Sequence, residues 1–287
     1  MQPRPEVTTT GPLTSEEERM QGLFRQMADH KDDSSNWPAD FAAVARGGAT
    51  DDNVSQVVTL WQSYCQRAQA GDPAAGEYAV MLTAPLSNYY SLHGDEERKR
   101  ALFQSTLEAL PSPAHQEVMR CRLARAALRA GDADSAKAWL ASCDAAPLDL
   151  AADSEYRLTA AYVATFDHDF ARVLSLLGHD LSSIPTAVSV RLLVVMLRAN
   201  ALEKSGDLDG AVAILHQFAS ISEGTLAEQG MAAAAKANSW LDVCPQSVPR
   251  AIAELQAARS VSMPAAPAAP AAPGEESKRR GLFGRRK

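Results

Sequence analysis

The sequence predicts an all-α fold built from antiparallel helix hairpins. Alanine is plentiful while aromatic residues make up only 6% of the chain, and this balance favours closely packed helices over a sheet sandwich. Apolar residues recur at the three- and four-residue spacing of a buried helix face, and no segment sustains the period-two alternation of a strand. Short breaks that contain Gly-Asp or Pro separate the helical stretches, as expected for tight connections between neighbouring helices.

The charge of the chain is unevenly distributed. The net charge is −7, yet the last thirteen residues hold six basic and two acidic side chains, leaving 22 basic and 33 acidic residues in the rest. Nucleic-acid phosphates select basic surfaces, so no nucleic-acid partner is expected for the folded body.

Several absences favour a cytoplasmic protein. The longest strongly apolar run, 192–197, is far shorter than the roughly 18 residues that a membrane span requires. Residues 1–20 lack the apolar core of a secretory signal. The four cysteines, at 65, 121, 143 and 244, have neither C-x-x-C nor metal-finger spacing, so we expect buried thiols and no metal.

Five helices are expected in the N-terminal half. Residues 1–13 are rich in Pro and Thr and are expected to be disordered, and 14–110 forms an N-terminal helical region. Helix starts are predicted at Ser15, Pro38, Asp51 or Asp52, Pro73 and Asp95. The helix that begins at Pro73 is expected to end near residue 84, and the one after Asp95 near Leu110, before Pro111.

The second half shows a self-similarity. Turns are predicted at 131–132, 166–167, 206–207 and 246–247, spaced by 35, 40 and 40 residues. Each is followed, five residues after its first residue, by an alanine: Ala136, Ala171, Ala211 and Ala251. A small side chain at that point lets two helices approach closely, and the Asp of a Gly-Asp turn can cap the second helix. A leucine follows four residues later in three units, whereas the second unit has Ser175.

This pattern resembles the tetratricopeptide repeat (TPR), most clearly from Leu197 through Ala199 and Leu202 to Gly206-Asp207. The resemblance covers about 115–260 and implies a right-handed α-solenoid, with repeats over 111–262 and the region 14–110 in the same stack. Arg120 and Glu155 stand where the family has a bulky residue early in the first helix, and the family's period of 34 is stretched. A non-repetitive helical bundle with Gly-Asp turns is the alternative.

The resemblance also implies a binding groove lined by the first helix of each repeat. The groove residues would be Arg125, Arg129, Tyr156, Met196 and Asn200. Their mixed character suits an extended or helical peptide, so we expect a scaffold or adaptor that binds a protein or peptide. Cys121 and Arg125 occupy the first two positions of the family's clamp for acidic chaperone tails, so that particular activity is not expected.

Two residue clusters are candidate sites. Arg122, Arg125 and Arg129 share one helix face, either as an anchor for a partner's carboxylate or phosphate or as a solvated face. Asp167-His168-Asp169 is either a metal or proton-transfer site or a capping turn. No phosphate-binding loop, zinc-protease or hydrolase motif occurs, so neither catalysis nor a cofactor is expected. An enzyme whose catalytic groups come from distant positions is the less favoured alternative.

The C-terminal tail combines an Ala/Pro linker, 263–277, with a basic segment, 278–287. The linker is a semi-rigid spacer. The expected docking residues are Lys278, Arg279, Arg280, Leu282, Phe283, Arg285, Arg286 and Lys287. Their target is either an anionic membrane, which would make the protein membrane-peripheral, or an acidic pocket on a protein. A disordered solubilising tail is the alternative.

Overall fold

The computed structural model describes residues 37–143, 150–177, 188–221 and 224–262. Every regular element in these ranges is a helix and none is a strand, which confirms the predicted all-α class. The predictions for 1–13, for the helix from Ser15, for the linker 263–277 and for the basic segment 278–287 lie outside the described residues.

The helices follow one another with short connections. In chain order they are α2 (Ala39–Gly47), α3 (Val54–Gln69), α4 (Pro73–Leu92), α5 (Glu96–Ala109), α6 (Pro113–Arg129), α7 (Ala133–Ala141), α8 (Leu150–Phe166), α9 (Phe170–Leu177), α10 (Val188–Lys204), α11 (Leu208–Ile221), α12 (Gly224–Ala237), the 3-10 turn η2 (Ser239–Leu241) and α13 (Ser247–Ser262).

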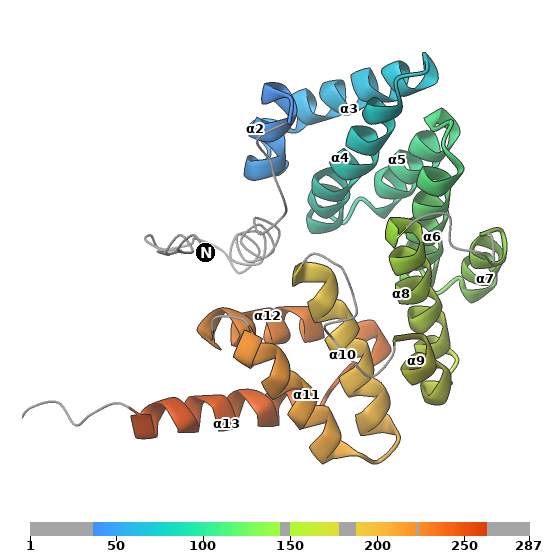
Figure 1. Ribbon diagram of the computed structural model, residues 1–287. Helices are drawn as coiled ribbons and strands as arrows, with labels where there is room; N and C mark the ends of the chain where they lie inside the picture. Colours follow the sequence, from blue (N-terminus) through green and yellow to red (C-terminus); the bar gives the residue numbers. More distant parts are fainter. Residues whose placement is uncertain (1–36, 144–149, 178–187, 222–223, 263–287) are drawn as a thin grey trace, which may run out of the picture.

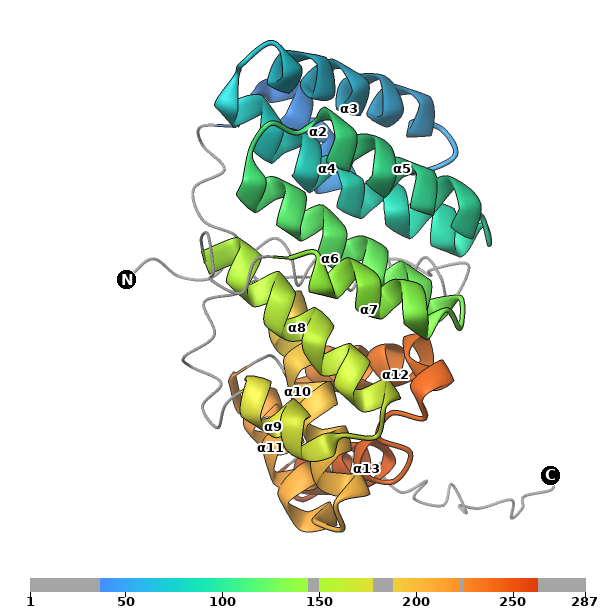
Figure 2. The same cartoon turned by 90° about the vertical axis from the view of Figure 1, so that its right-hand side faces the viewer.

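Consecutive helices pack as pairs, and alternate helices pack as rows. The pairs α3/α4, α6/α7, α8/α9 and α10/α11 pack extensively, and α6, α8, α10 and α12 also contact one another in succession. Figure 1 shows the helices along a curved path from α2 through α6 and α8 to α13. In the view turned by 90°, they descend in layers from α3 to α13 (Figure 2).

Five turns share one hydrogen-bond pattern. A residue with positive φ donates its N–H to the carbonyl three residues back, and the following Asp donates its N–H to the carbonyl five residues back. This is the Schellman arrangement, which satisfies carbonyls at the end of a helix. The Asp side chain then accepts an N–H at the start of the next helix. The turns are Gly71-Asp72, Gly94-Asp95, Gly131-Asp132, His168-Asp169 and Gly206-Asp207.

The predicted second repeat turn is displaced by two residues. The residue with positive φ is His168 (φ 58°), and Asp169 accepts from the N–H of Arg172 at 3.1 Å. The residue five positions on is therefore Val173, which is fully buried, whereas Ala171 is exposed. The position nine residues after the turn is likewise the buried Leu177 rather than Ser175. In this register the turns at 131, 168 and 206 are 37 and 38 residues apart.

The helix predicted to end near residue 84 continues through Pro85 to Leu92. A proline inside a helix removes one backbone hydrogen bond and crowds the preceding turn. In that preceding turn, the carbonyl of Val80 accepts from the Thr83 hydroxyl at 2.7 Å and from Arg122 at 3.0 Å. Packing of α4 against α3 and α5 also holds the segment helical, so tertiary contacts outweigh the local signal.

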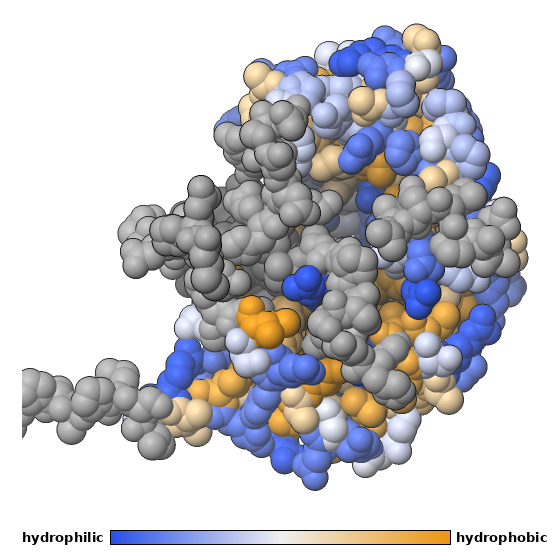
Figure 3. All heavy atoms as spheres, viewed as in Figure 1, coloured by the Kyte–Doolittle hydropathy of each residue, from blue (hydrophilic) through white to orange (hydrophobic). Residues whose placement is uncertain are grey.

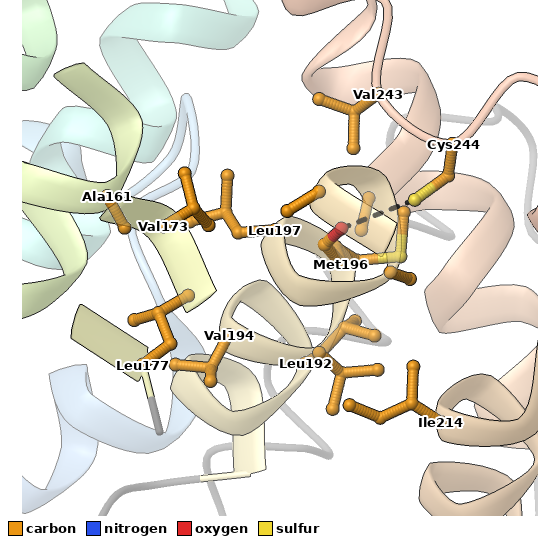
Figure 4. Close-up of a cluster of buried hydrophobic side chains, with 14 of the residues drawn as sticks. Ala161, Val173, Leu177, Leu192, Val194, Met196, Leu197, Ile214, Val243 and Cys244 are labelled. Atoms are coloured by element: carbon orange, nitrogen blue, oxygen red, sulfur yellow. Dashed lines mark hydrogen bonds between the residues drawn. The ribbon is translucent and has the colours of Figure 1, made fainter. Parts of the chain in front are cut away.

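The core has two clusters that meet at α6. Met119 and Leu123 belong to the N-terminal cluster, and Ala127 and Leu128 to the C-terminal one. Helix α10 is covered on two sides: Val194 and Leu197 point toward α8 and α9, whereas Leu192 and Met196 point toward Ile214 and Cys244 (Figure 4). Because α10 is buried on both sides, its middle part, residues 192–197, is a continuous apolar run.

Polar groups of α10 fix the segment that leads into α13. Cys244 donates its Sγ proton to the Met196 carbonyl at 3.2 Å and its backbone N–H to Asn200 Oδ1 at 3.0 Å. One turn further, the buried Glu203 carboxylate accepts from the backbone N–H groups of Gln246 and Ser247 and from the Ser247 hydroxyl. Glu203 therefore caps α13 from another helix, in the manner of an N-cap side chain.

No helix in the described ranges is long and apolar enough to cross a membrane.

The left-handed turns predict opposite effects for two substitutions. In Gly206→Ala the added Cβ meets no other atom, but the backbone there has a φ of 90°. The strain of this backbone conformation should lower the free energy of unfolding by about 1–2 kcal/mol. His168→Gly removes that strain at an equivalent turn and should leave stability unchanged or raise it by up to about 1 kcal/mol. Urea denaturation measures the free energy of unfolding of both variants.

Gly47→Ala, at a helix position without positive φ, is the control and should not destabilise the protein. A loss with His168→Gly as large as with Gly206→Ala would contradict the turn assignment.

Candidate functional site

The candidate site is a cationic cluster on α6. Arg122, Arg125 and Arg129 stand at i, i+3 and i+7, so they share one face of the helix. Proline at the first position opens α6, and the Gly131-Asp132 turn ends it. Because α6 packs against α4 on one side and α8 on the other, this face lies over the junction of the three helices.

Arg122 joins α6 to α4 and α8. Its guanidinium donates to the Val80 carbonyl at 3.0 Å and to the Thr83 hydroxyl of α4. It also lies 3.5 Å from a carboxylate oxygen of Glu155 on α8. With only 17% of the side chain exposed, Arg122 is mainly a structural tie.

Arg125 makes the shorter contact with Glu155. Its guanidinium lies 2.6 Å from Glu155 Oε2 and donates to the Thr159 hydroxyl, also at 2.6 Å. Burial alone would raise the pKa of Glu155, but the two guanidinium groups outweigh it and hold that pKa below its usual value. The carboxylate is therefore ionised at neutral pH and shared by two arginines.

Lys99 and Glu96 of α5 extend the cluster toward the end of α6. The Lys99 ammonium, 7% exposed, donates to Glu96 at 2.8 Å and to the Ser91 hydroxyl at 2.9 Å. Burial, and then repulsion from Arg129, lower the pKa of Lys99. Arg129 itself is exposed, and no described carboxylate lies within ion-pair distance of it.

The cluster therefore carries an excess of positive charge inside an acidic protein. Four cationic side chains face two carboxylates, Glu96 and Glu155, while the whole chain has a net charge of −7. Arg129 offers a guanidinium fork that can hold two carboxylate oxygens at once. The arrangement can bind an anionic group, and it presents no nucleophile paired with a base.

The predicted groove residues do not lie on one surface. Arg125 and Arg129 belong to the α6 cluster, and Tyr156 is half-buried on α8. Met196 and Asn200 are each 1% exposed and contact the segment before α13. These two residues are therefore in the core, because the segment before α13 covers the face of α10 that the resemblance assigned to the groove.

Sequence reasoning missed the partners of the arginines. Glu155 and Lys99 were not candidate residues, although both lie at the centre of the cluster. A signal was present at Glu155, which departs from the bulky residue of the family at that position. Its charge is explained by the two guanidinium groups on the neighbouring helix.

The Asp167-His168-Asp169 cluster forms a capping turn. Asp169 caps α9, His168 adopts the left-handed conformation, and Asp167 pairs with Lys137 at 2.8 Å. Across the part of the chain that the structure describes, no group of three or more His, Cys, Asp or Glu side chains could hold a metal ion. The tail docking residues, Lys278 to Lys287, lie outside that part.

Comparisons with known proteins add no family. No protein-family model, curated protein or solved structure matches this chain. The fold and the α6 cluster define an all-helical protein with a largely buried cationic cluster that ends at the exposed Arg129. The likeness to the tetratricopeptide repeat remains a prediction.

The low pKa of Glu155 predicts a pH-dependent loss of stability. The Glu155 carboxylate takes up a proton at about pH 4.3 in the unfolded state and at a lower pH in the folded state. The stabilising contribution is therefore fully present above about pH 4.3 and is lost as the pH falls through the folded pKa. Glu155→Gln should cost about 2 kcal/mol at pH 7, and the gap to wild type should close toward pH 3 in urea denaturation.

Glu77→Gln provides the matched control. Glu77 is exposed on α4 and has no ion-pair partner among the described residues. Its replacement should stay within about 0.5 kcal/mol of wild type at each pH. A Glu155→Gln difference that is the same at pH 7 and pH 3 would rule out the charge-sharing explanation.

Proposed function

We propose that this chain is a protein-interaction scaffold or adaptor that holds an acidic peptide segment of a partner protein at the α6 cluster. In this proposal the helix hairpins form a solenoid of the tetratricopeptide kind. The observation that carries the proposal is the exposed Arg129 at the edge of a cluster with excess positive charge, in a chain that is otherwise acidic.

The packing of the helices supports the solenoid. Each of α6, α8 and α10 contacts its hairpin partner and the next first helix, and α11 contacts α13 in the second row. Packing mainly between neighbouring hairpins is typical of stacked repeats. One contact reaches further, because the Tyr162 hydroxyl of α8 donates to Asn238 Oδ1, just after α12, at 3.0 Å. The shared turn geometry at Gly131, His168 and Gly206 gives each hairpin the same connection.

The rigidity of the cluster supports binding of a guest. Arg122 and Arg125 are held by Glu155, Thr83 and Thr159, so their guanidinium groups are already ordered and lose little freedom when a partner binds. In the view of Figure 3, hydrophilic residues cover much of the upper half of the molecule, and hydrophobic residues in the lower half are bordered by hydrophilic ones.

The test uses a fluorescently labelled hexaglutamate peptide and the full chain. Fluorescence anisotropy should show binding that weakens as salt is raised, because exposed charges are screened. Arg129→Ala should weaken the affinity about fivefold, which corresponds to about 1 kcal/mol. Circular dichroism should show that the exposed substitution leaves the fold intact.

Arg172→Ala is the control for charge alone. Arg172 is exposed on α9, in the other row of helices. Replacing it by Ala removes the same charge far from the cluster. It should bind hexaglutamate like wild type. If Arg129→Ala and Arg172→Ala bind equally well, or if wild type does not bind the peptide, the α6 cluster is not the anchor.

A second candidate function rests on the basic segment 278–287, whose six basic residues surround Leu282-Phe283. Each basic residue near an anionic bilayer contributes about 1 kcal/mol, and the apolar pair adds partial burial. The tail would then recruit the folded body to a membrane surface. Co-sedimentation with phosphatidylserine vesicles tests this candidate, and binding that survives replacement of the six basic residues by Ala would exclude it.

A further inference from the structure

Two of the four cysteines face each other. Cys121 lies on α6 and Cys143 lies two residues beyond the end of α7, yet their sulfur atoms are only 3.9 Å apart. All four cysteines are free thiols. We propose that Cys121 and Cys143 are a redox modification site, which peroxide converts into a disulfide between α6 and the end of α7.

The geometry brings the two sulfurs into contact, at 3.9 Å. A disulfide requires about 2.05 Å, so the sulfurs must approach by about 2 Å. Cys121 is fully buried in α6, whereas Cys143 follows the last turn of α7 and is half-buried. Its thiol makes only a weak contact with the Trp139 carbonyl, at 3.7 Å. Cys143 is therefore the residue that moves when the two sulfurs approach each other.

The surroundings give the two thiols different roles. Hydrogen bonding with Cys121 lowers the pKa of Cys143, and Arg120 acts in the same direction. Hydrogen bonding with Cys143 and burial raise the pKa of Cys121. Cys143 is half-buried whereas Cys121 is fully buried, and the thiolate is the nucleophile. Cys143 is therefore the residue that reacts with peroxide first, and Cys121 is the residue that resolves the product.

The reaction balances with hydrogen peroxide as the oxidant. The Cys143 thiolate attacks one peroxide oxygen, the O–O bond breaks, and a sulfenic acid and a hydroxide form. Cys121 then gives up its proton and attacks the Cys143 sulfur, so that the S–S bond forms and the S–OH group leaves as hydroxide. The two hydroxides and two protons make two waters. The sulfurs lose two electrons to the peroxide, and a dithiol reductant reverses the change.

Cys65 and Cys244 are the internal controls. Both are buried, and burial raises the pKa of Cys65 to about 11 and that of Cys244 to about 12. Neither has another cysteine within hydrogen-bond distance among the described residues. They should therefore remain thiols under conditions that oxidise the pair.

The test treats the reduced full chain with hydrogen peroxide, alkylates the remaining thiols and maps the peptides by mass spectrometry. The expected result is a linked peptide pair containing Cys121 and Cys143, with Cys65 and Cys244 alkylated, and full reversal by dithiothreitol. Since the bond closes a loop of about twenty residues, the Tm of the oxidised chain should rise by roughly 5 °C.

Two variants separate the roles of the thiols. Cys121→Ser should leave a sulfenic acid at Cys143 that dimedone traps, and Cys143→Ser should lose oxidation at both positions. Cys65→Ser should behave like wild type. The wild-type peptide map tests the proposal even if a variant folds poorly. Four alkylated thiols after peroxide treatment, or a disulfide that involves Cys65 or Cys244, would overturn the proposal.

Discussion

The left-handed turn followed by an Asp cap is the constraint on which the rest of the structure depends. At Gly131, His168 and Gly206 one residue closes the preceding helix and the next residue caps the following one. The chain therefore reverses without a free loop, and the two helices of a hairpin must lie against each other. Close approach then requires that the residue five positions after the turn be buried, as Ala136 and Val173 are.

The same constraint places the charges. The second helix of each hairpin packs directly against the first. The first helices α6 and α8 therefore become neighbours, although α7 separates them in sequence. Arg122 and Arg125 then need a counter-charge in a place with little water, and Glu155 supplies it for both. Arg129 stands one turn further along and is exposed, so part of the excess charge lies at the surface.

The sequence made the helical class and most turns predictable, because Gly-Asp pairs and apolar periodicity are local signals. The turn at 168–169 was misplaced because the left-handed residue is a histidine, which gives no such signal. The end predicted before Pro85 was wrong because contacts from other helices decide it. Met196 and Asn200 were assigned to a groove, yet the segment before α13 covers them. No local sequence pattern indicates which distant segment packs on a helix.

Helix α6 carries the arginine cluster, part of the core and Cys121, on different faces. Arg122 and Arg125 tie it to α4 and α8, and its apolar residues belong to both core clusters. Cys121 directly precedes Arg122 on this crowded helix, so its backbone has little room to move. A bond from Cys121 to Cys143 must therefore draw the end of α7 toward α6 rather than the reverse. The arginine cluster would then keep its geometry, because the proposed disulfide moves the end of α7 and leaves the backbone of α6 in place.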